Sequence, residues 1–174
     1  MTSDTSLLAM KLGSLASSRA LRIAAAESLT GGLLSSAIVS AAGASHYFVG
    51  AIVAYDTAVK HSLLGVDPQL LRTNGPVDDE VARQMARGVR EACGATLAAD
   101  VKNRHVDIGV ATTGVAGPDP DPQTGQPVGT IWIGVSSDRG ERAVHLQLSG
   151  TRLQIREATV HAALQELIAE IESL

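Results

Sequence analysis

The chain has 174 residues, of which 45% are hydrophobic and 18% are charged, so it has enough apolar side chains to fold around a core. Its formal net charge of -4 disfavours a general nucleic-acid binder, because such proteins need positive charge to neutralise phosphates, and we expect no nucleic-acid partner. Cys93 is the single cysteine, which excludes intramolecular disulfides and cysteine-rich zinc sites.

Helical and strand patterns alternate along the sequence. Thr30 and Asp56 are positioned to cap two helices, and the acidic pair 78–79 opens a third. Short apolar or alternating runs mark the strands. The expected helices run from about Ser6 to Ser17, from Thr30 to about Ala42 with Gly43 ending it, over a short segment containing Lys60, from Asp78 to about Cys93, and from Leu153 to about Glu172. The expected strands cover 22–26, 47–54, 106–113, 130–136 and 143–148.

This order of elements decides the fold class. Strands interleaved with helices predict helices on both faces of a sheet. The turn 138–140 between two alternating segments predicts an antiparallel hairpin. We therefore expect an α/β fold, a three-layer α/β/α sandwich with a mixed, mostly parallel sheet, formed by residues 1–174 as a single domain. The stretch 96–105 is polar and is either a surface loop or a helix extension. The last helix is expected to face the core with Ala158, Ala162, Leu164 and Ile168.

The first candidate site is the segment 27–32, Glu-Ser-Leu-Thr-Gly-Gly, which joins a strand to a helix. Such a turn lies at the carboxyl edge of the sheet, where open α/β folds bind ligands. Its glycines leave the amides at the helix start free to bind an anion or a developing oxyanion. Alternatively, Ser28 and Thr30 are capping residues without a chemical role.

The second candidate is the segment 55–60, which contains Tyr55 and Lys60. A lysine that is desolvated against an apolar wall loses its proton near neutral pH and then serves as a general base. Lowering its pKa from about 10.4 to about 8 costs the cation roughly 3 kcal/mol, which burial against residues 52–54 and Val59 would supply. Ser–Lys pairs are a known alternative to Ser–His–Asp. Alternatively, Lys60 is a solvated surface cation.

The third candidate is the segment 112–118, Thr-Thr-Gly-Val-Ala-Gly-Pro, which follows the most hydrophobic strand. Its hydroxyls and glycine amides are suited to hold a carbonyl or a phosphate, although a tight turn explains the glycines equally well. Asp119 and Asp121 alternate with prolines, which favours a solvated loop over a cation site. No nucleotide-binding glycine motif occurs, and the five histidines lack metal-ligand spacing, so we expect neither a metal nor a cofactor.

A membrane location is disfavoured by the sequence. The uncharged stretch 28–55 is interrupted by glycines, serines and His46, and never offers the about 18 continuous apolar residues that a span needs. No basic segment followed by an apolar core opens the chain, so we expect no secretory signal. We expect a cytoplasmic protein without a membrane partner. The Ala-rich helix surfaces favour a homo-oligomer, with a dimer as the expected state.

Taken together, the blocks AESLTGG at 26–32, GAIVAY at 50–55 with Lys60, TGVAGP at 113–118 and PVGT at 127–130 resemble the CinA C-terminal domain family. That family includes the stand-alone nicotinamide-nucleotide amidohydrolases of the PncC type, and the resemblance covers nearly the whole chain. It implies that the carboxamide of nicotinamide mononucleotide is hydrolysed to nicotinic acid mononucleotide and ammonia, in pyridine nucleotide recycling.

The resemblance also assigns roles to individual residues. Ser28 would attack the amide carbon, and Lys60 would accept its proton and later help to protonate the leaving ammonia. Tyr55 would assist proton transfer or position the lysine. The substrate-binding residues would be Thr30, Gly31 and Gly32 through amides that stabilise the oxyanion, Thr113, Gly114 and Gly117 in the glycine loop, and Arg152 and Arg156 as donors to the phosphate.

The chain departs from the family pattern at several positions. The family often has Gly or Lys where Asp119 and Gln126 stand, so the loop here is less positive. Milder changes are Thr57 in place of Asn, Asp78 in place of Ser and Thr151 in place of Asp. These departures keep two alternatives open. One is a regulatory domain that binds a nucleotide without turnover, and the other is a general Ser–Lys amidase for unphosphorylated substrates.

Overall fold

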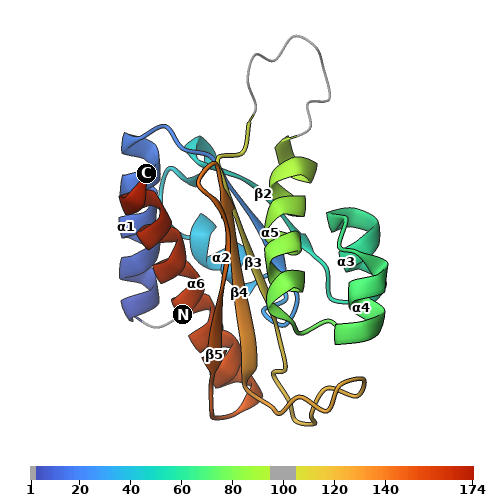
Figure 1. Cartoon of the computed structure of the whole chain (residues 1–174). Coiled ribbons are helices and arrows are strands. Elements are labelled where there is room, and N and C mark those ends of the chain that lie inside the picture. Colours follow the sequence, from blue (N-terminus) through green and yellow to red (C-terminus); the bar gives the residue numbers. More distant parts are fainter. Residues whose placement is uncertain (1–2, 95–104) are drawn as a thin grey trace.

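The computed structural model describes residues 3–94 and 105–174 (Figure 1). In this part of the chain five strands form one sheet in the order β2-β1-β3-β4-β5. The β1 strand pairs in parallel with β2 and β3, whereas β3–β4 and β4–β5 are antiparallel. All strands except β4 therefore run in one direction. The strands are β1 (Ile23–Glu27), β2 (Phe48–Val53), β3 (Ile108–Gly114), β4 (Thr130–Ser137) and β5 (Gly140–Gln147).

Helices cover both faces of this sheet, which confirms the three-layer α/β/α architecture (Figure 1). Each face has its own apolar cluster, and β1 contributes Ile23 and Ala25 to one and Ala24 and Ala26 to the other, as the alternation of strand side chains requires. One face carries α1 (Ser3–Ser18), α2 (Leu33–Val39) and α6 (Arg152–Ser173). The other carries α3 (Thr57–Leu64), α4 (Pro68–Asn74) and α5 (Asp79–Gly94).

Helix α5 lies unusually close to the sheet because two strand positions are glycine. A Cβ atom at Gly109 of β3 would lie 2.1 Å from the carbonyl oxygen of Ala86, and one at Gly134 of β4 would lie 2.0 Å from that of Ala82. Any other residue would force the helix away from the sheet. The close approach fixes the turn of α5 that carries Met85, a buried side chain with a place in the site described below.

The start of α2 differs from the sequence-based expectation. The helix begins at Leu33, not at Thr30, and it ends at Val39, before the expected end. The Thr30 hydroxyl is buried and hydrogen-bonds to the Thr112 hydroxyl of β3 at 2.8 Å, so it does not cap the helix. The expectation was wrong because it considered only local sequence, whereas Thr30 finds its partner on a neighbouring strand.

Smaller differences occur elsewhere. Gly43 does not end α2 but precedes a short 3-10 helix, Ala44–His46. Ala158 was expected to face the core but is exposed. Helix α4 was not predicted, and residues 95–104, most of the polar stretch discussed above, lie outside the described part. The other elements lie within a few residues of their predicted ranges. No helix among the described residues combines the length and apolar character needed to cross a membrane.

Candidate functional site

The three candidate segments meet at one cavity of about 360 Å³ at the carboxyl edge of the parallel strands. Ser28 follows β1, Tyr55 follows β2 and Thr113 is the second-last residue of β3, so neighbouring strands bring them to the same edge, as expected for an open α/β sheet. The cavity is lined by Ser28, Leu29, Tyr55, Thr57, Lys60, Pro76, Val77, residues 113–117, residues 119–122 and Arg152.

Ser28 lies in a tight turn directly after β1. Its amide donates to the Thr112 carbonyl at 3.0 Å, which continues the pairing with β3 by one residue. Its carbonyl accepts from the Gly31 amide at 3.1 Å, which closes the turn. Gly31 has a φ of 57°, a left-handed conformation that glycine adopts without strain. The side chain is 9% exposed, so the turn presents the hydroxyl to the cavity and to little bulk solvent.

Glu27, the residue before Ser28, caps helix α2 from a distance. Its fully buried carboxylate accepts hydrogen bonds from the amides of Gly32 at 2.8 Å, Leu34 at 3.1 Å and Ser35 at 2.8 Å, and also from the Ser35 hydroxyl. An acidic group at a helix N-terminus is favourable because it satisfies free amides and the helix dipole. This carboxylate therefore occupies the anion position that the sequence predicted for a ligand.

The amides expected to stabilise an oxyanion are consequently engaged within the protein. The Gly32 amide donates to Glu27 and the Gly31 amide donates to the Ser28 carbonyl, so neither amide is a free donor in this structure. Neither Gly31, Gly32 nor Thr30 lines the cavity. Among the described hydrogen bonds of this turn, the amides of Leu29 and Thr30 have no protein acceptor, which leaves them as the free donors next to Ser28.

Lys60 is buried, with 1% of its surface exposed, which rules out the solvated surface cation as an alternative. Its Nζ donates to the Ala54 carbonyl at 3.3 Å and lies 3.7 Å from Met85 Sδ. Neither partner is a carboxylate, and burial lowers the pKa of Lys60 to about 7, against a smaller opposing effect of the Asp56 charge. Burial thus favours the neutral amine far more than in a solvated lysine.

The position of Lys60 is fixed by the cap of its helix. The Asp56 carboxylate accepts from the Ala58 amide at 2.7 Å at the start of α3, as expected from the sequence. Lys60 lies one turn later in α3, and its Nζ contacts the Ala54 carbonyl after β2 and the Met85 sulfur. The apolar wall was expected from residues 52–54 and Val59, but Val53 is 48% exposed and Met85 of α5 takes part instead.

Arg152 joins two walls of the cavity. Its guanidinium donates to the Tyr55 hydroxyl at 2.9 Å and also to the Gly117 carbonyl, and it lines the cavity from the start of α6. The capping box of Thr151 and Gln154 fixes this helix start. Arg152 is therefore placed to meet a negatively charged group of a ligand at the mouth of the cavity.

Arg156, four residues further along α6, does not line the cavity. Its Nε donates to the Leu29 carbonyl at 2.9 Å and its Nη2 donates to the Thr30 carbonyl at 2.8 Å. The structure thus separates the two arginines that the sequence grouped together. Arg152 faces the cavity, whereas Arg156 binds the backbone of the turn that carries Ser28.

The glycine loop closes the cavity on the side of β3. Gly114 and Gly117 line it, and the Thr113 hydroxyl donates to the Pro76 carbonyl at 2.6 Å, which ties the loop to the segment before α5. Asp119 and Asp121 line the same cavity and add negative charge opposite Arg152. No group of three or more His, Cys, Asp or Glu that could hold a metal occurs among residues 3–94 and 105–174.

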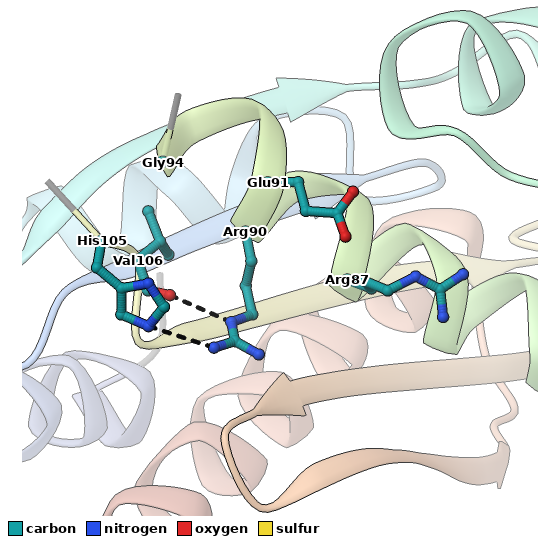
Figure 2. A pocket seen from close by; sticks show the side chains of 6 residues that line it. All are labelled: Arg87, Arg90, Glu91, Gly94, His105 and Val106. Carbon is teal, nitrogen blue, oxygen red and sulfur yellow. Dashed lines mark hydrogen bonds between the residues drawn. The ribbon is translucent and has the colours of Figure 1, made fainter. Parts of the chain in front are cut away.

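A second cavity, of about 510 Å³, lies at the opposite edge of the sheet between the end of α5 and the start of β3 (Figure 2). Its arginines are engaged within the protein: Arg90 pairs with Asp138 and the Val106 carbonyl, and Arg87 pairs with Glu141. Among the described residues that line it there is no serine and no lysine.

Comparisons with known proteins agree with this fold. Residues 5–171 match the family described as the CinA C-terminal domain. A CinA-like protein of Salinibacter ruber is 40% identical over 95% of this chain, and one of Frankia casuarinae is 44% identical over 92%. The chain spans 37% and 34% of the lengths of these two relatives. The crystal structure of a competence/damage-inducible protein of Agrobacterium tumefaciens is similar to this one, with a TM-score of 0.85 and 31% identity, covering 97% of this chain and 96% of that one.

Proposed function

Because the chain belongs to the CinA C-terminal domain family, we propose that it hydrolyses the carboxamide of nicotinamide mononucleotide to nicotinic acid mononucleotide and ammonia. The observation that carries this proposal is that Ser28 and Lys60 line one cavity, with Lys60 buried and its pKa lowered to about 7. A neutral amine and a serine hydroxyl that line the same cavity are the two groups that Ser–Lys hydrolases use.

In this mechanism Ser28 Oγ attacks the carboxamide carbon while the neutral Lys60 amine accepts the hydroxyl proton. The negative charge that develops on the carbonyl oxygen is stabilised by a backbone amide of the Ser28 turn, for which Leu29, which lines the cavity, supplies a free donor. The Lys60 ammonium then protonates the leaving nitrogen, and ammonia departs. Water attacks the acyl-enzyme with Lys60 again as base, which releases the acid and restores the serine.

Arg152 supports recognition of the phosphate. It reaches the cavity with two donors that now bind the Tyr55 hydroxyl and the Gly117 carbonyl, both weaker acceptors than a phosphate dianion. The carboxamide would then point toward Ser28 and the phosphate toward the start of α6. Tyr55 remains close to Arg152 in this arrangement, where it either positions the arginine or assists proton transfer.

The direct test is to incubate the purified chain with nicotinamide mononucleotide and measure ammonia and nicotinic acid mononucleotide together. Release of both in equal amounts, lost in Ser28→Ala, supports the proposal. Binding of the mononucleotide without release of either product would favour a regulatory nucleotide-binding domain instead.

The acidic lining of the cavity supports a second candidate, a Ser–Lys amidase for unphosphorylated amides. Asp119 and Asp121 line the cavity and would repel a phosphate. Arg156 is hydrogen-bonded to the backbone, so of the two arginines only Arg152 is available to bind a phosphate. A competition assay between nicotinamide and its mononucleotide separates the candidates. Preference for the mononucleotide supports the first proposal, and preference for the free base supports the second.

A further inference from the structure

We infer that Arg156 is a positioning residue that holds the Ser28 turn in its reactive geometry, and not a ligand of the substrate's phosphate. This inference rests on the proposed function, because it assigns a role within the same site. It starts from the two hydrogen bonds of the guanidinium, from Nε to the Leu29 carbonyl and from Nη2 to the Thr30 carbonyl. These are the two residues that directly follow Ser28.

The geometry of the peptide unit links this contact to the orientation of the backbone that follows Ser28. In a trans peptide the carbonyl and the amide N–H point to opposite sides. Since the Leu29 carbonyl points to Arg156, the Thr30 amide in the same peptide unit points away from Arg156. The next unit behaves likewise, because the Thr30 carbonyl also faces Arg156 and the Gly31 amide points back to the Ser28 carbonyl at 3.1 Å. Arg156 thereby sets the direction of a free amide beside Ser28.

Most of the turn has supports that do not involve Arg156, but the Leu29 carbonyl has none among the described hydrogen bonds. At one end Glu27 is fixed by β1 and by its four hydrogen bonds to the start of α2. Below the turn, the Thr30 hydroxyl binds the Thr112 hydroxyl. The Thr30 carbonyl also accepts from the Leu33 amide at 3.2 Å, whereas Arg156 is the donor to the Leu29 carbonyl among the described hydrogen bonds. A single guanidinium reaches both carbonyls because its Nε and Nη donors lie in one plane with a fixed spacing, which a lysine ammonium does not offer.

Gly31 provides separate evidence that Arg156 packs closely against the turn. A Cβ atom at Gly31 would lie 3.3 Å from Arg156 Nη2, closer than ordinary side-chain contacts. Position 31 thus combines a left-handed backbone with a guanidinium packed against it. Glycine satisfies both demands, and a larger residue would displace the arginine from the Thr30 carbonyl.

The test compares Arg156→Lys and Arg156→Gln with Arg152→Lys and Arg152→Gln, using nicotinamide mononucleotide and nicotinamide riboside, which lacks the phosphate. A positioning role predicts that both Arg156 variants lose kcat on both substrates, by roughly 10²-fold, with KM nearly unchanged and no rescue by lysine. A phosphate ligand would instead show a raised KM for the mononucleotide alone, partly rescued by lysine. That result, or wild-type kinetics in both variants, would overturn the inference.

A second readout is independent of the amide substrate. The rate at which a fluorophosphonate probe labels Ser28, identified by peptide mass spectrometry, should fall in the Arg156 variants and stay unchanged in Arg87→Gln, which removes an arginine that pairs with Glu141 and does not line this cavity. Gly31→Ala, which keeps the arginine but crowds it, should show the same loss if the Arg156 variants fail to fold. If the wild-type chain is labelled and substitutions at Arg156 and Gly31 do not change the labelling rate, the inference about Arg156 is overturned, whereas the proposed function is not. If the wild-type chain shows neither labelling nor turnover, the proposed function is overturned together with this inference.

Discussion

The Arg152 guanidinium donates a hydrogen bond to the Tyr55 hydroxyl across 2.9 Å, although the two residues lie 97 positions apart in the sequence. The contact connects the start of α6 with the end of β2 and passes over the cavity that Ser28 and Lys60 line. Tyr55 is 60% exposed, so this hydrogen bond adds little to folding stability. We interpret it as a contact that holds the arginine in place before a substrate arrives.

If Tyr55 positions Arg152, the two residues should act as a unit. We expect Tyr55→Phe and Arg152→Gln each to lower kcat/KM for nicotinamide mononucleotide. The loss of transition-state stabilisation in the double variant should be smaller than the sum of the losses in the two single variants. The coupling free energy should be about 0.5–1.5 kcal/mol, the value of one hydrogen bond. Steady-state kinetics of the four proteins measure it. Strictly additive effects would show that Tyr55 acts independently of the arginine, for example in proton transfer.

Ser28→Ala should abolish turnover while leaving the fold intact. The side chain has no hydrogen bond that the described residues require for folding, and its backbone contacts to Thr112 and Gly31 do not depend on the hydroxyl. We expect kcat to fall by a factor of at least about 10³, as for other serine nucleophiles. Ammonia release measures the loss, and calorimetric titration with the mononucleotide should show retained binding. Residual activity close to wild type would remove Ser28 from the mechanism.

The pH dependence of turnover should report the titration of Lys60. Its pKa of about 7 means that the neutral, active amine is scarce at pH 5 and predominates at pH 9. We therefore expect kcat/KM to rise about tenfold per pH unit below pH 7 and to level off above it. Initial rates in buffers of constant ionic strength give the profile. A midpoint near 10 would indicate an ordinary solvated lysine, in conflict with its burial.

How much of this site follows from sequence depends on how local each contact is. The Asp56 cap of α3 was predictable, because the donor at Ala58 lies two residues away. The cap of α2 was not, because the Glu27 side chain reaches over the intervening turn to Gly32 and Ser35, leaving Thr30 to bind β3. Helix α4 had a local signal that was missed: the Asp67 carboxylate accepts from the Gln69 amide, with Pro68 in the first turn.

The roles of the charged residues required tertiary structure. The spacing of Arg152 and Arg156 places both on one side of α6, but only the packing of α6 against two different loops shows that one faces the cavity and the other the Ser28 turn. In the same way, the burial of Lys60 depends on Met85, which α5 brings from 25 positions away. Motifs identified the residues, and long-range packing determined where each of them lies.

Lys60→Met should stabilise the protein at low pH. The pKa of Lys60 is lower in the folded protein than its ordinary value of 10.5, so the unfolded chain holds one more proton between about pH 7 and 10.5 and wild-type stability rises with pH there. Below pH 7 the wild-type chain bears the full cost of a buried ammonium, up to roughly 5 kcal/mol. Methionine has a similar shape and no charge. The free energy of unfolding of the variant should therefore exceed that of wild type by more at pH 6 than at higher pH.

Urea unfolding of both proteins at pH 6 and pH 9 measures this effect as a difference, so that other titrating groups cancel. We expect the advantage of Lys60→Met to shrink by roughly 3 kcal/mol between the two pH values. The variant should be inactive at both. An equal difference at pH 6 and pH 9 would mean that the lysine does not titrate in this window.

Asp56→Asn should shift the pH profile of turnover without disturbing the helix that carries Lys60. The Asp56 charge raises the pKa of Lys60 against the larger effect of burial, so removing that charge lowers the pKa further. Asparagine caps helices about as well as aspartate, and its side-chain oxygen can keep the bond from the Ala58 amide. The midpoint of the pH profile of kcat/KM should therefore move to lower pH while the plateau rate stays similar.

Asp67→Asn, the same change at the cap of α4, serves as the matched control and should leave the midpoint in place. A midpoint that moves upward in Asp56→Asn, or that moves equally in both variants, would contradict an electrostatic effect of Asp56 on the general base.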